Sequence, residues 1–152
     1  MPAALITVLQ PQLRALREVQ APQQISAAAD RTNGYRVSSA AFKPGRDGTV
    51  SVDLEESLLR SGLTATGRYP AMDRAVALVA HRIQAVVDQG MTVAHAPIEG
   101  NEHHAEIRMG ALSRKAIERA ARALADACEF LEQFNVAEIE RISAAAKPGA
   151  AA

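Results

Sequence analysis

Three of the four histidines of this chain fall within a dozen residues, together with three glutamates. An imidazole titrates near neutral pH, so a histidine beside a carboxylate can accept or donate a proton in the physiological range. His104 is the histidine that we expect to act as a general base or acid. The same stretch offers ligands for zinc or another divalent ion if His95, Glu99 and His104 converge.

The spacing of these histidines limits what they can form. The stretch contains no HExxH pattern, and the adjacent His103 and His104 would point to opposite faces of a strand, so a site that uses both is not expected. The alternative is structural, in which residues 97–102 form a polar hairpin loop between half-buried, hydrogen-bonded histidines. The catalytic, metal-binding and structural interpretations all remain open.

A cation and hydroxyls near a strand end could hold a phosphate or carboxylate group of a substrate. Arg36 and Ser38 share one face of a predicted strand, and Lys43 follows it. These residues predict a small hydrolase or transferase in which His104 moves a proton while Arg36 or Lys43 holds an anionic substrate. Polar residues are equally typical of the solvent face of a strand, and the pattern favours this simpler interpretation.

Composition argues against several classes of function. Lysine plus arginine balances aspartate plus glutamate at 17 each, so no net charge attracts the chain to nucleic acid or to an anionic membrane. Aromatic residues make up 3% of the chain, which provides few rings for stacking on bases. Neither common glycine-rich phosphate loop is present, and no cofactor is indicated. We expect no membrane contact and regard nucleic-acid binding as unfavoured.

The predicted helix after Ser113 carries four cations that acidic residues interrupt, which is typical of a solvated face. They are Arg114, Lys115, Arg119 and Arg122. The single cysteine, Cys128, fits a small buried residue in a reducing compartment. No secretory signal pattern and no apolar run of about 18 residues is present, so the sequence predicts a cytoplasmic protein.

The ends of the chain differ from its centre. Apolar residues over positions 3–19 recur at three- and four-residue spacings around Pro11, and residues 20–32 have no period, so residues 1–32 are predicted to form a helical arm and a connector. Residues 33–143 then form one domain. Residues 144–152 contain only Ala, Lys, Pro and Gly and are predicted to be a disordered tail.

Alternation predicts strands over residues 35–42 and 50–52 that pair through a long turn. Asp53 and Glu56 resemble a capping box for a short helix ending at Gly62.

Residues 71–89 allow two interpretations, and we favour a strand over 75–80 and a helix over 82–89 rather than one helix. Strands over 91–96 and 104–109 follow.

Two further helices complete the prediction. The first begins at Ser113 and carries an apolar stripe that includes Ile117, Leu124 and Leu131; the second begins at Asn135. The chain is therefore predicted to have an α+β fold, with a small, mostly antiparallel sheet packed by helices on one face and with helical N- and C-terminal extensions.

Three segments resemble a pattern in small bacterial proteins of unassigned function. They are R-V-S-S-A-A-F at 36–42, G-T-V-S-V-D at 48–53 and the stretch 101–107, which contains Asn101, His104 and Ile107. The resemblance covers about half of the chain, from Arg36 to Gly110. It implies no activity, but it selects His104 over His103 and favours a strand over 75–80.

Two functions are consistent with these observations. The first is an accessory or regulatory protein that binds a protein partner, or a second copy of itself, through its helical ends. Neutral charge and few polar clusters favour this function. The second is the His104-dependent hydrolase or transferase, and a metal site at His95, Glu99 and His104 is a weaker possibility.

Overall fold

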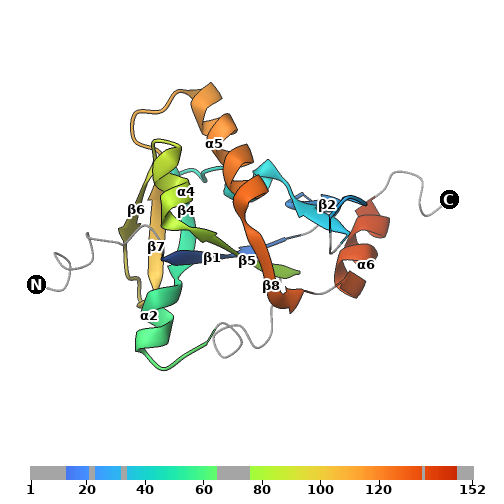
Figure 1. The fold of residues 1–152 in the computed structure, drawn as a ribbon, viewed down its shortest axis with the longest axis horizontal. Helices are drawn as coiled ribbons and strands as arrows, with labels where there is room; N and C mark the ends of the chain where they lie inside the picture. The colour runs from blue at the N-terminus through green and yellow to red at the C-terminus, as the bar shows by residue number, and fades with distance from the viewer. Residues whose placement is uncertain (1–12, 21–22, 32–33, 65–75, 135, 147–152) are drawn as a thin grey trace, which may run out of the picture.

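The computed structural model describes residues 13–20, 23–31, 34–64, 76–134 and 136–146 (Figure 1). Its strands are β1 (Arg14–Val19), β2 (Ile25–Ala27), β3 (Tyr35–Val37), β4 (Thr49–Leu54), β5 (Ala77–Arg82), β6 (Thr92–His95), β7 (His104–Arg108) and β8 (Glu129–Phe134). Its helices are α2 (Glu55–Arg60), α4 (Ile83–Asp88), α5 (Arg114–Ala127) and α6 (Val136–Ala146), with a 3-10 turn, η1 (Ser39–Phe42).

Six of the strands form one antiparallel sheet in the order β6-β7-β4-β1-β5-β8. Strands β2 and β3 form a separate two-stranded sheet. The predicted α+β class and the mostly antiparallel sheet are therefore confirmed. None of the helices in the described part is long and apolar enough to cross a membrane.

Alternate residues of the six-stranded sheet face two different layers. On the main face, Ala15, Val52 and Val79 join a large core with α4, α5, η1 and the small sheet. On the second face, Leu16 and Leu78 pack against Leu58 of α2. Because α2 lies across the second face, helices cover both faces rather than the single face that the sequence predicted.

The predicted N-terminal helix is wrong where the structure describes it. Residues 14–19 form β1, which lies between β4 and β5 in the sheet. Ala15 and Leu16 are both buried, one on each face. A strand buried on both sides loses the apolar-polar alternation that distinguishes it from a helix. Residues 1–12 lie outside the described residues, and the predicted connector contains β2.

The predicted pairing of residues 35–42 with 50–52 is also wrong. β3 pairs with β2, while β4 pairs with β1 and β7. Between them η1 buries Ala41 and Phe42, which turns the chain away from β3. Asp53 is the penultimate residue of β4 rather than a cap, and α2 begins without a side-chain cap hydrogen bond.

Most of the later elements are confirmed. β5 and α4 occupy the predicted strand and helix, and β6 and β7 lie at their predicted positions. The Ser113 hydroxyl caps α5 by accepting a hydrogen bond from the Ala116 amide at 3.2 Å.

Strand β8 was not predicted, and it includes Leu131, which had been assigned to the helical stripe. Helix α6 extends to Ala146, so the predicted tail is wrong for residues 144–146, and residues 147–152 lie outside the described residues.

Candidate functional site at His103

The three residues of the predicted metal site do not converge. His95 pairs with Ala105 on the main face, whereas His104 pairs with Asp53 on the second face. Glu99 lies exposed in the loop between β6 and β7. Across the described residues, no group of three His, Cys, Asp or Glu side chains could hold a metal ion.

The predicted substrate-binding cations also lie away from His104. Arg36 forms an ion pair with Asp126 of α5, with 3.2 Å between the guanidinium and the carboxylate, and Lys43 follows η1 on the main face. His104 is on the second face, where its Nδ1–H donates to the Ala96 carbonyl at 2.8 Å. The sheet therefore separates His104 from Arg36 and Lys43.

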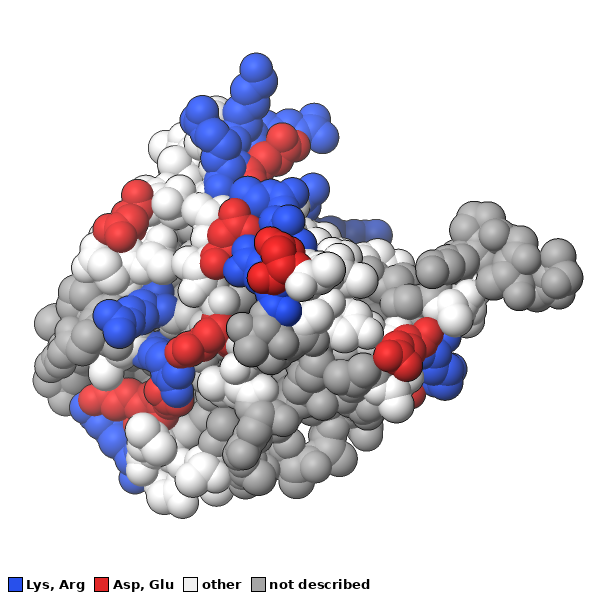
Figure 2. Space-filling model, turned by 45° about the vertical axis from the view of Figure 1, so that its right-hand side comes forward, with Lys and Arg blue, Asp and Glu red and all other residues white. Residues whose placement is uncertain are grey.

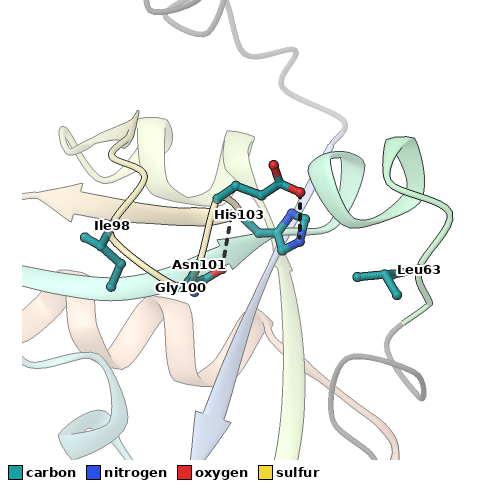
Figure 3. A pocket seen from close by; sticks show the side chains of 6 residues that line it. Leu63, Ile98, Gly100, Asn101 and His103 are labelled. Atoms are coloured by element: carbon teal, nitrogen blue, oxygen red, sulfur yellow. Dashed lines mark hydrogen bonds and ion pairs between the residues drawn. The ribbon is translucent and has the colours of Figure 1, made fainter.

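The neighbouring His103 makes the contacts that a functional histidine requires. Its side chain is buried, and its Nδ1 lies 2.8 Å from the Ser57 hydroxyl of α2. Its Nε2 lies 3.8 Å from a Glu102 carboxylate oxygen (Figure 3). At 3.8 Å the contact between Nε2 and Glu102 is longer than a hydrogen bond, so it does not fix which imidazole nitrogen carries the proton. In the tautomer with the proton on Nε2, the Ser57 hydroxyl donates to Nδ1, which is the arrangement of a serine beside a base.

A set of hydrogen bonds holds His103 in this place. The Asn101 amide nitrogen donates to the buried Asp53 carboxylate at 2.8 Å, and its oxygen accepts from the His103 backbone amide at 3.1 Å. The Leu54 amide donates to the His103 carbonyl at 2.9 Å. These bonds join the loop to the end of β4, directly before α2 presents Ser57.

An open pocket of about 500 Å³ lies beside His103. Leu63 and Ile98 stand on either side of the imidazole in Figure 3, and both are exposed. Gly100, Asn101 and Glu102 complete the lining. Gly100 has a φ of +81°, a left-handed conformation that favours glycine, and this allows the tight turn at the pocket rim. Ser57 is not among the lining residues.

Neither family models, nor curated proteins, nor solved structures match this chain. The interpretation of the site therefore rests on its geometry. The sequence resemblance that selected His104 stays a prediction, whereas the structure gives His103 the serine and carboxylate neighbours. Ser57 was missed because it is 46 residues from His103 and only the pairing of β4 with β7 brings the two together.

The remaining reactive side chain, Cys128, does not contribute to this site. Burial raises the pKa of its thiol to about 12, and the thiol donates to the Ala125 carbonyl at 3.3 Å. The thiol is therefore protonated at neutral pH and unsuited to nucleophilic attack. This agrees with the structural role predicted for Cys128.

Proposed function

We propose that this chain is an accessory or regulatory protein that binds a segment of a partner protein at the His103 pocket. One observation carries the proposal. The large hydrophobic side chains that are exposed in the described part number four, Leu59, Leu63, Val87 and Ile98. Leu63 and Ile98 line the pocket. Exposed apolar side chains gathered around a pocket are typical of protein interfaces.

The charge of the pocket indicates the chemistry of the partner. Glu102 lines it with a side chain that is 73% exposed, and Glu99 lies exposed in the same loop. No lysine or arginine is among the lining residues. The segment that fits this surface therefore carries an apolar side chain for the space between Leu63 and Ile98, and a lysine or arginine to pair with Glu102.

A photo-reactive residue at position 98 tests this proposal in the full chain. We expect crosslinks from position 98 to a discrete apolar and basic segment of one partner, and no such crosslinks from position 87. Val87 is the matched control because it is exposed to a similar degree on α4. The crosslinked segment, made as a peptide, should bind about tenfold more weakly to Ile98→Asp than to the natural chain or to Val87→Asp.

Two outcomes would contradict this assignment. Crosslinks from position 98 to a second copy of the chain would make the surface a self-association site. If Ile98→Asp and Val87→Asp weaken binding of the peptide equally, the pocket is not part of the interface.

A second candidate function follows from the contact between Ser57 and His103. In a hydrolase or transferase, the Ser57 hydroxyl attacks an acyl carbon and its proton passes to His103 Nδ1, which then protonates the leaving group. Glu102 supports the positively charged imidazole. The glutamates around the pocket disfavour the anionic substrate predicted from the sequence, so a neutral or cationic acyl compound fits better.

A fluorophosphonate probe tests the enzymatic alternative. If Ser57 is a nucleophile, the probe should label Ser57, and Ser57→Ala should lower hydrolysis of a panel of neutral esters by about 10²–10⁴-fold. Ser61→Ala is the control, because the Ser61 hydroxyl donates to the same Glu102 at 3.1 Å but does not touch His103. Absence of label on Ser57 in the folded protein would eliminate this alternative.

A further inference from the structure

Helix α5 places a row of cations opposite its buried side. Its buried residues are Ala120, Ala121, Leu124 and Ala125. At about 100° per residue, Lys115, Arg119 and Arg122 lie on the opposite side of the helix, and all three are exposed. We call these three residues the α5 row. In Figure 2, Lys and Arg side chains gather at the top of the molecule, where Figure 1 places α5.

Among the residues that the structure describes, the cations of the α5 row form no ion pair with a carboxylate, whereas several arginines elsewhere do. Within the described part, five arginines each pair with a carboxylate: Arg14, Arg36, Arg60, Arg108 and Arg141. The structure gives no such pair for Lys115, Arg119 or Arg122. Their charge is therefore available to a second molecule.

The spacing of the row fits a helix of opposite charge. The intervals of four and three residues correspond to about 6 and 4.5 Å along the helix axis. A partner helix with acidic residues at i, i+4 and i+7 repeats the same intervals, so the two rows can pair along their length. The chain has no net positive charge and α5 contains no aromatic residue that could stack on bases, which disfavours a nucleic-acid partner.

We propose that the α5 row is a docking surface for an acidic helix of a partner protein. The surface is separate from the His103 pocket, because α5 covers the main face of the sheet while α2 packs on the second face. Both surfaces can be occupied at once, and the docking of an acidic helix does not depend on the function proposed for the pocket.

The test uses a synthetic alanine-based helical peptide with glutamates at i, i+4 and i+7, and a second peptide of the same composition with a different spacing. At low ionic strength, we expect the matched peptide to bind more tightly than the respaced one. The triple variant Lys115→Glu, Arg119→Glu, Arg122→Glu should weaken binding of the matched peptide at least about tenfold. The control variant Arg82→Glu, Arg108→Glu, Arg141→Glu changes charge equally at exposed positions elsewhere.

Three results would overturn the proposal. The first is equal binding of both peptides, which would show attraction to any anion. The second is equally weakened binding of the matched peptide to the two triple variants, which would mean that net charge rather than the α5 row determines the affinity. The third is tighter binding to a duplex RNA or to anionic phospholipid vesicles than to the matched peptide. Circular dichroism of both variants confirms that each remains folded, so a loss of binding reports on the surface.

Discussion

Replacing Phe42 with alanine is expected to lower the free energy of unfolding by about 3–5 kcal/mol. Phe42 ends η1 and is 1% exposed within the main core. Its ring and the His81 ring pack in a T-shaped arrangement, with 5.5 Å between the two centroids. Because η1 packs on α5 and connects the small sheet to the six-stranded sheet, the space left by the ring cannot close without moving both layers.

Urea unfolding measures this loss, and the m-value should stay constant if the change is confined to stability. Leu59→Ala provides the control, because Leu59 is also a large hydrophobic residue but is 59% exposed, and its loss should change stability by less than about 0.5 kcal/mol. Similar losses for both variants would mean that η1 is not part of the cooperative core.

The elements that were predicted correctly have a clear periodicity of apolar residues, and α5 also has a clear capping residue. Helix α5 combines an apolar stripe with a serine cap, and both signals are present in its structure. β7 alternates, with Ala105 and Ile107 buried on one face and His104 and Glu106 on the other. In such segments the local pattern and the tertiary environment agree, so one sequence suffices to identify them.

The errors occur where tertiary packing decides between two local possibilities. β1 is buried on both faces, so its apolar residues satisfied a helical spacing as well as a strand. Leu131 continued the helical stripe of α5, yet the helix ends at Ala127 and Cys128 takes an extended conformation before β8. Nothing in the local spacing distinguishes a continued helix from a strand that pairs with the distant β5.

In the candidate site too, tertiary packing decides what the local sequence pattern could not predict. The alternation argument does not apply to His103 and His104, because His103 lies in the turn before β7 and only His104 belongs to the strand. Which of the two lies beside a useful partner depends on the register in which β4 pairs with β7 and on the position of α2 after β4. That register joins residues more than 50 positions apart and has no local signal. For the same reason, the distance of Arg36 from His104 could not be predicted.

The structure also contains a histidine for which no sequence pattern indicated a role. His81 lies in β5 and is 2% exposed in the main core. Its Nδ1–H donates to the Arg82 carbonyl at 3.3 Å, and its Nε2 is buried without a hydrogen-bond partner. Burial lowers the pKa of His81 to about 4, the hydrogen bond to Arg82 opposes this shift, and the charge of Arg17 adds to it.

This pKa predicts a loss of stability in acid. Well above pH 6.5 the imidazole is neutral in both the folded and the unfolded state, so its ionisation does not change the free energy of unfolding. Between pH 6.5 and about 4 the unfolded chain binds a proton that the folded chain does not, so the free energy of unfolding falls by about 3 kcal/mol as the pH drops. Below pH 4 the folded protein is protonated as well, and the contribution of His81 to the loss ends.

Urea unfolding at a series of pH values, for the natural chain and for His81→Leu, isolates this contribution. Carboxylates titrate in both proteins, so the difference between the two curves reports on position 81. We expect that difference to change by about 3 kcal/mol between pH 6.5 and 4, in favour of His81→Leu, and to be constant above pH 7. Parallel curves over the whole range would mean that the imidazole reaches water or a proton acceptor in the folded protein, and that the core around Phe42 and Arg17 is more open than its packing indicates.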